Sequence, residues 1–362
     1  MTAIGFSAKF PQMTEDARKS AKSPRLIDIA NRLNLTKVSV SKGLRDHPDM
    51  APATSALIKK TAMEMGYLPN RLARSLRSSR SNLVGLVVPK IRHAFFAELV
   101  AGVEEAAAEQ RIELLLGVSN EDPVVERRHI ETFLSMRADA LLVSATEHNP
   151  PEQQQFYQDA RTRGTPLIFF DRLPTTLEPG WPTVTMDDAG GARAAIDAAV
   201  ARGYRRISLI GGPRATNIGT ERLRGYCEGM AQHQLEIADG WIVERRFDER
   251  SGYDGFLALW SGTQKPDAIL CASYPIALGV IDAMRLHAPE ALGRVLILFF
   301  GLHEQLRLMP QPCVCLVQPA LALGREAMRL AIAVRDEMPN ARSKPLAIEI
   351  ATDCNARPSY QI

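Results

Sequence analysis

The sequence predicts an all-α head followed by an α/β core of two doubly wound parallel-sheet lobes. From residue 82 onward, short apolar runs alternate with amphipathic segments, a pattern typical of parallel sheets covered by helices on both faces. This region holds about 280 residues, which is large for one sheet, so two similar lobes are expected. The head is also distinguished by charge. Residues 1–80 carry 15 Lys and Arg against 6 Asp and Glu, whereas residues 81–362 carry 29 against 35.

This charge asymmetry indicates that the head meets a polyanion, although a solvated basic surface would have the same composition. No run of apolar residues is long enough for a transmembrane helix, and residues 1–22 contain neither an apolar stretch of signal-peptide length nor a cleavage site. The sequence therefore predicts a cytoplasmic protein without a membrane partner. Residues 1–22, which are polar and lack periodicity, are expected to form a disordered tail.

Three short helices are predicted within residues 23–69. Ser23 and Pro24 begin the first helix, and Asn34 can end it in the left-handed conformation. Thr36 caps a second helix that ends at Leu44. The third runs from Pro52 to Gly66, and its inward stripe comprises Leu57, Ile58, Thr61, Ala62 and Met65. A core of this size is typical of a helix-turn-helix DNA-binding domain.

The second helix of such a domain lies in the major groove and presents its N-terminal residues to base edges. Lys37 can bond guanine, and Val38 can contact a thymine methyl group. Thr36 and Ser39 carry hydroxyls suited to phosphates. One turn further on lie Ser41 and Lys42. The competing interpretation is a solvated helix face.

In the core, apolar runs predict eight strands, and patterns such as Phe95–Glu109 and Gly190–Ala201 predict helices between them. The strands are Leu83–Val88, Glu113–Val118, Ala138–Ser144, Pro166–Phe170, Arg206–Ile210, Ala268–Cys271, Val295–Phe299 and Val314–Val317. Ligands of such folds bind beyond the carboxyl ends of the strands, which here means the cleft between the lobes.

Several segments resemble the lactose-repressor (LacI/GalR) family of transcriptional regulators. LIDIANRLNLTKVSVSKGL and PDMAPATSALIKKTAMEMGYLPNRLARSL resemble its DNA-binding head, and SNLVGLVVP, HAFFAELVAGVEEAA, GYRRISLIGGP and QPALALGREA resemble its core. The resemblance implies a type I periplasmic-binding-protein-like core at 82–362. It places the N-lobe at about 82–186 and 320–341, and the C-lobe at about 187–319 and 342–356. Residues 70–81 would form a hinge helix and linker, in which Asn70 and Ala73 contact operator DNA and Leu76 wedges between base pairs.

The resemblance also implies a set of effector contacts. Phe95, Phe96, Asp171, Arg222 and Phe247 match pocket positions of the family. Ser273 and Tyr274, and His303 in Gly301-Leu302-His303, replace positions where acidic or amide side chains usually bond sugar hydroxyls. Because Arg222 remains, with Arg172 and Arg214 in nearby loops, we expect an anionic effector such as the sugar acid gluconate. Neutral sugars and purines stay open, and no cofactor or metal is expected.

The predicted protein is therefore an effector-controlled homodimer that represses transcription from a pseudo-palindromic DNA site. A periplasmic-type solute-binding protein is the alternative, which the basic head and the missing export signal disfavour. An enzyme is disfavoured because Gly211-Gly212-Pro213 lacks the spacing of a nucleotide-binding loop and no catalytic constellation is visible.

Overall fold

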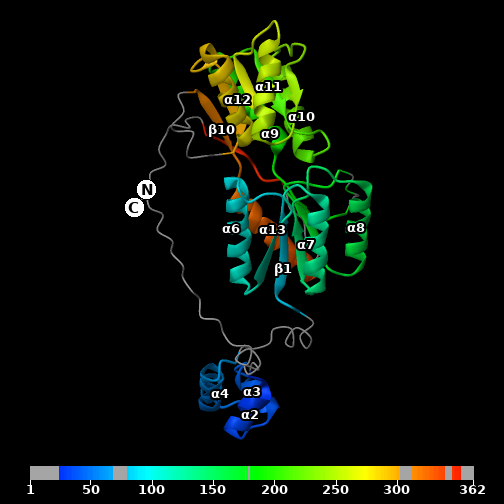
Figure 1. Ribbon diagram of the computed structural model, residues 1–362, viewed down its shortest axis with the longest axis vertical. Helices are drawn as coiled ribbons and strands as arrows, with labels where there is room; N and C mark the ends of the chain where they lie inside the picture. Colours follow the sequence, from blue (N-terminus) through cyan, green and yellow to red (C-terminus); the bar gives the residue numbers. More distant parts are fainter. Residues whose placement is uncertain are drawn as a thin grey trace, which may run out of the picture. The chain divides into compact units, whose positions relative to one another are not determined.

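The computed structural model describes residues 24–67, 80–175, 177, 180–301, 311–338 and 345–351. Residues 349–351 are described by their backbone alone. Contacts between residues divide the chain into two compact units, residues 1–79 and residues 80–362. The first contains the helical head, and the second contains both α/β lobes (Figure 1).

The head consists of helices α2 (Leu26–Leu33), α3 (Lys37–Gly43) and α4 (Pro52–Glu64). Their shared core is formed by Ile29, Ala30, Val40, Ile58 and Ala62. Gly43, which a helix interior disfavours, is required by this packing. A Cβ atom there would lie 2.4 Å from Cδ1 of Ile58, so glycine lets α3 approach α4 closely.

Two details of the predicted head are wrong. Helix α2 begins at Leu26 rather than at Pro24, because the Asp28 carboxylate accepts a hydrogen bond from the backbone N–H of Arg25 at 2.7 Å. Leu57 is 52% exposed, since the inward stripe of α4 follows Ser55, Ile58 and Ala62 at helical spacing. Asn34 ends α2 with φ 55°, as the sequence predicts.

The N-lobe contains a parallel sheet in the order β2-β1-β3-β4-β5. Its strands are β1 (Leu83–Val88), β2 (Glu113–Val118), β3 (Ala140–Val143), β4 (Leu167–Phe170) and β5 (Thr183–Val184). Helices α6 (Ala94–Glu109) and α13 (Ala320–Arg335) pack on one face of the sheet, and α7 (Pro123–Ser135) and α8 (Pro151–Thr162) pack on the other. The central strands are buried on both faces, which explains their continuous apolar sequences.

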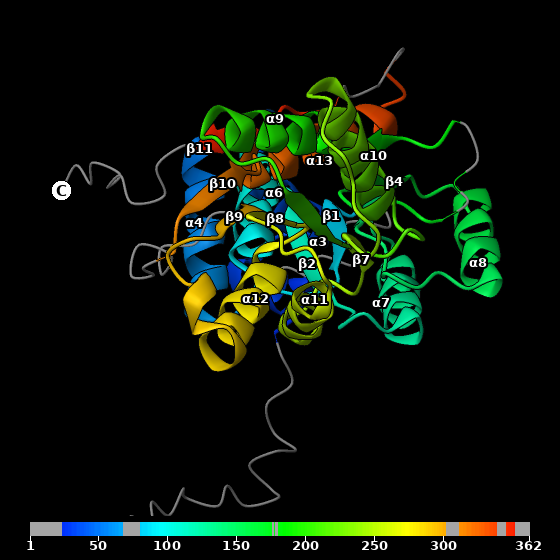
Figure 2. The same cartoon turned by 90° about the horizontal axis from the view of Figure 1, so that it is seen from above.

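The C-lobe sheet has the order β11-β10-β9-β8-β6-β7, parallel except for the edge strand β11. Its strands are β6 (Ile207–Gly211), β7 (Ile242–Glu244), β8 (Ala268–Cys271), β9 (Leu296–Phe300), β10 (Cys313–Val317) and β11 (Glu349–Ala351). Its helices are α9 (Asp188–Ala201), α10 (Asn217–Gln232), α11 (Glu249–Ser261) and α12 (Tyr274–His287), with a short 3₁₀ turn at Pro289–Ala291. Figure 2 shows α9 and α10 on one side of this sheet and α11 and α12 on the other.

The predicted fold class is confirmed, and all eight predicted strands are present with ends within two residues of those expected. The strands that the sequence did not predict, β5, β7 and β11, are only two or three residues long and show no period. No described helix combines the length and apolar composition needed to span a membrane.

Two helices do not pack in the lobe that contains the strand preceding them, but in the other lobe. Helix α13 follows β10 of the C-lobe but packs against α6 of the N-lobe, and α9 follows β5 of the N-lobe but packs against α10 of the C-lobe. The α13–α6 contact is close, because a Cβ atom at Gly102 would lie 2.1 Å from the Leu321 carbonyl oxygen, and one at Gly324 would lie 2.1 Å from that of Leu99.

Candidate functional site

A cavity of about 630 Å³ lies between the two lobes of the core, a volume typical of small-molecule sites. Its walls include the starts of α6, α11 and α12 and the residues that follow β1, β4 and β9, so it lies beyond the carboxyl ends of the parallel strands. The residues predicted to contact an effector that line it are Phe95, Phe96, Asp171, Arg222, Phe247, Ser273 and Tyr274. His303 lies outside the described residues.

Arg222, on α10, is held in a single orientation. Its Nε and Nη2 atoms donate to Oδ1 of Asp188 at 2.8 and 2.7 Å, and Nη1 donates to the carbonyl oxygen of Ala272. Its guanidinium carbon lies 3.8 Å from the ring centroid of Phe300. Asp188, which was not predicted, thus offsets the charge of Arg222. Arg214, also counted as a nearby cation, does not line this cavity and pairs with Glu244 at 3.1 Å.

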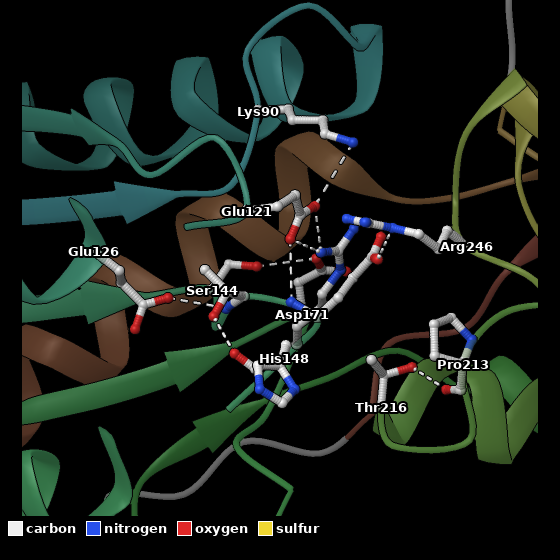
Figure 3. A network of polar contacts seen from close by, with 12 residues as sticks. Lys90, Glu121, Glu126, Ser144, His148, Asp171, Pro213, Thr216 and Arg246 are labelled. Carbon is white, nitrogen blue, oxygen red and sulfur yellow. Dashed lines mark hydrogen bonds and ion pairs between the residues drawn. The ribbon is translucent and has the colours of Figure 1, made fainter. Parts of the chain in front are cut away.

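Asp171 lies at the floor of the cavity, immediately after β4. It is 3% exposed and adopts the left-handed conformation with φ 57°. The Ser144 hydroxyl donates to its Oδ2 at 3.2 Å (Figure 3). Burial raises the pKa of Asp171 to about 6, although Arg172 and Arg222 favour its ionised form.

Arg172 joins a buried ionic cluster beside Asp171. Its Nη1 donates to both carboxylate oxygens of Glu121 at 2.7 and 3.0 Å, and Lys90 Nζ lies 3.8 Å from Glu121 (Figure 3). Burial opposes ionisation of Glu121, but Arg172, the backbone amide of Glu147 and Lys90 together hold the pKa of Glu121 below its ordinary value. Glu121 has φ 64° and follows Asn120 with φ 53°, two consecutive left-handed residues that no sequence pattern indicated.

The phenylalanine side chains mostly pack the lobes. Phe247 is 6% exposed, and its ring lies over Gly212, where a Cβ atom would be 2.1 Å from Cζ. The glycine-rich segment after β6 therefore makes room for Phe247. Phe96 is 5% exposed in the N-lobe core. Phe95 is half-buried and makes an edge contact with Phe96 at a centroid distance of 5.1 Å, so it has more surface available to a ligand.

Ser273 occupies the N-cap position of α12, but its side chain caps no N–H group. Its Oγ atom is buried and has no hydrogen-bond partner in the described part of the chain. Helices α6 and α13 also begin at the cavity, without a side-chain cap or an acidic residue in the first turn. Because helix N-termini carry partial positive charge and unpaired N–H groups, these three helix starts favour an oxygen-rich or anionic ligand.

In the head, Lys37 and Val38 are exposed at the start of α3, and Val38 retains 65% of its accessible surface. The hydroxyl of Thr36 accepts from the backbone N–H of Ser39 at 3.0 Å and contacts the Ser39 hydroxyl at 2.9 Å. Thr36 therefore caps α3, as predicted. This bond leaves Thr36 less suited to a phosphate contact than the sequence suggests.

Lys42 is half-buried and donates to the Asp49 carboxylate at 2.9 Å, so it would have to exchange this partner for DNA. Ser41 is also half-buried, one turn from the start of α3. The hinge residues Asn70, Ala73 and Leu76 lie outside the described residues. Among the residues that are described, no three His, Cys, Asp or Glu side chains are grouped to hold a metal ion.

Comparison with known proteins agrees with this architecture. Residues 81–302, more than half of the chain, match the family model described as periplasmic binding proteins and sugar binding domain of the LacI family. The HTH-type transcriptional repressor PurR of Klebsiella pneumoniae (strain 342) is 26% identical over 327 residues, covering 89% of this chain and 93% of that protein.

Two solved structures share the fold. The lac repressor dimer bound to operator and an anti-inducer has a TM-score of 0.78 at 19% identity, covering 91% of this chain and 98% of the other. The Cra regulator of Pseudomonas putida, in complex with fructose 1-phosphate, has a TM-score of 0.65 at 23% identity, covering 75% of this chain and 98% of the other. With the family-model match across both lobes, the chain belongs to the LacI family.

Proposed function

We propose that this protein is a sequence-specific DNA-binding repressor whose operator affinity is controlled by a small molecule bound between the lobes. The observation that carries the proposal is the combination of two features in one chain. One is a helix-turn-helix head whose second helix exposes Lys37 and Val38, and the other is a cleft lined by buried charged groups. A solute-binding protein would need only the second.

The DNA-binding test begins with selection of bound duplexes from a random pool, followed by titration of the enriched site at several salt concentrations. We expect a pseudo-palindromic site bound by a homodimer. Val38→Asp should abolish selection by placing a carboxylate against the groove, whereas Lys60→Ala, an exposed change on α4, should retain the same site. Failure of the wild-type chain to enrich any sequence would favour the solute-binding alternative.

For the effector, we propose a sugar acid of the gluconate type. Arg222 supplies oriented N–H donors rather than net charge, because Asp188 already pairs with it. The attraction for a carboxylate would come from the uncapped starts of α6, α12 and α13 and from Arg92 on the cavity wall. The sugar hydroxyls would bond Asp171 and Ser273.

Calorimetry with gluconate and its neutral parent glucose tests this assignment. We expect gluconate to bind more tightly, and Arg222→Lys to weaken binding because lysine keeps the charge but loses the guanidinium fork. Arg214→Ala, which removes a cation outside the cavity near the start of the same helix, serves as the matched control. Tight binding of a neutral sugar or a purine, with no binding of the acid, would contradict the anionic effector and leave the repressor proposal standing.

A further inference from the structure

The floor segment of the cleft, Asp171–Leu173 of the N-lobe, is hydrogen-bonded by a side chain of the C-lobe. Asn217 is the first residue of α10 in the C-lobe. Its Nδ2 donates to the carbonyl oxygen of Asp171 at 3.0 Å, and its Oδ1 accepts from the backbone N–H of Leu173 at 3.0 Å. One amide therefore satisfies a backbone acceptor and a backbone donor of the N-lobe on either side of Arg172. An amide carries its donor and its acceptor on two separate atoms, which a carboxylate or an ammonium group does not.

We propose that Asn217 is a positioning residue that latches the two lobes in the closed arrangement and fixes the cleft floor for the ligand. Asn217 does not itself line the cavity. It acts through the backbone of Asp171, whose left-handed conformation leaves its carboxylate beside Ser144. Helix α10 also carries Arg222, five residues after Asn217. The Asn217 hydrogen bonds therefore connect two charged residues of the cavity wall, Asp171 and Arg222, to this one helix.

Three further contacts cross between the lobes beside the Asn217 hydrogen bonds. The Arg172 guanidinium lies 5.3 Å from the ring centroid of Phe247. Figure 3 shows Arg246 reaching from the C-lobe toward this cluster, where its Nε donates to Glu147 at 3.2 Å. The Arg246 side chain is 64% exposed, so this ion pair is screened by solvent.

The third contact joins the Thr175 hydroxyl to the carbonyl oxygen of Ala215 at 3.1 Å, and it is exposed. Of all these contacts, the Asn217 amide alone makes two hydrogen bonds to the floor segment. Its loss should therefore shift the equilibrium between open and closed lobes more than loss of any one of the others.

Substitution at Asn217 separates positioning from packing. Asn217→Ala removes both hydrogen bonds. Asn217→Asp keeps the shape and the acceptor for Leu173, but it turns an oxygen toward the Asp171 carbonyl in place of a donor. Thr220→Val, which breaks a bond within the C-lobe to the Arg214 carbonyl, is the control on the same helix. Thr175→Val is the control for a different cross-lobe bond.

The readout is the distance between the lobes in the full chain without ligand. Spin labels introduced as unnatural amino acids at the exposed residues Glu131 and Glu236 report it by pulsed electron paramagnetic resonance. Labelled chains are diluted with unlabelled ones so that only distances within a chain are seen. We expect one short distance in the wild type and in Thr220→Val, and an added longer distance in Asn217→Ala and Asn217→Asp. An unfolding midpoint for each variant excludes loss of the fold.

The proposal is overturned by unchanged distances in both Asn217 variants, or by equal opening in Thr175→Val. Wild-type distances in Asn217→Asp alone would show that shape rather than the amide donor matters, and would also overturn it. The ligand arm rests on the proposed function and uses gluconate, whose affinity should fall about tenfold in Asn217→Ala as the closed fraction falls. If gluconate does not bind the wild type, the effector assignment fails while the distance measurement still decides the latch.

Discussion

Replacing Asp171 with asparagine tests the net cost of one buried carboxylate that lines the cleft, in which burial acts together with the charges of Arg172, Arg222 and Asp188. The side chain is 3% exposed, and burial raises its pKa from an ordinary value of 3.8 to about 6. Because the folded-state pKa lies above the unfolded-state value, the free energy of unfolding falls as the pH rises from 3.8 to about 6 and is then constant, and the cost vanishes as the pH falls below 3.8. The penalty amounts to about 3 kcal/mol at pH 8 and about 1 kcal/mol at pH 4.5.

The asparagine side chain in the Asp171→Asn variant would be neutral at every pH and could still accept the Ser144 hydrogen bond. We therefore expect Asp171→Asn to raise the free energy of unfolding of the core by about 3 kcal/mol at pH 8, and by about 1 kcal/mol at pH 4.5. Urea unfolding of both proteins at the two pH values measures this difference. Comparing variant with wild type at each pH cancels the titration of all other groups.

The control is Asp197→Asn, because Asp197 is exposed on α9 and its carboxylate pairs with the half-buried His233 at 2.6 Å. It should change stability little at pH 8. The reasoning about Asp171 is refuted if Asp171→Asn is less stable than the wild type at pH 8. It is also refuted if the gain is the same at both pH values, since the gain would then not come from titration of the Asp171 carboxylate.

Three further outcomes are expected. Gly212→Ala should destabilise the core by about 1–3 kcal/mol in urea unfolding, because its Cβ atom would displace the Phe247 ring, whereas Gly203→Ala, in open space, should show only backbone strain. Leu76→Ala should weaken operator binding at matched salt without changing the unfolding of the core, as fluorescence anisotropy can measure, and unchanged affinity would refute the hinge assignment. Light scattering of the full chain in dilute solution should give the mass of a dimer, and a stable tetramer would contradict the proposed assembly.

The sequence predicts the fold class because the central strands are buried on both faces and therefore read as continuous apolar runs. Thr36 and Asn34 were recognisable for a similar reason, since capping depends on local chemistry. The errors at Ser23 and Leu57 arise where two interpretations fit the local pattern and tertiary packing decides between them. The short edge strands β5, β7 and β11 depend on pairing with a neighbour and have no sequence period of their own.

The cleft was predictable in outline but not in its charge balance. Arg222 and Arg172 were identified in the sequence as cations near the cleft, yet their counter-charges come from residues distant in sequence. Asp188 lies 34 positions from Arg222, and Glu121 lies 51 positions from Arg172. No spacing rule connects such pairs, and Glu121 also depends on an unusual backbone conformation. The two hydrogen bonds of Asn217 likewise could not be predicted from the sequence, because both partners are backbone atoms.

The crossed placement of α9 and α13 has a consequence for the chain's modularity. The two sheets share one strand order, β2-β1-β3-β4-β5 and β7-β6-β8-β9-β10, which is the pattern expected of an internal duplication in which each copy has given its last helix to the other. A fragment ending after β5 would lack α13 and expose the apolar face of α6. Neither lobe can therefore be expressed as one contiguous segment with its core intact.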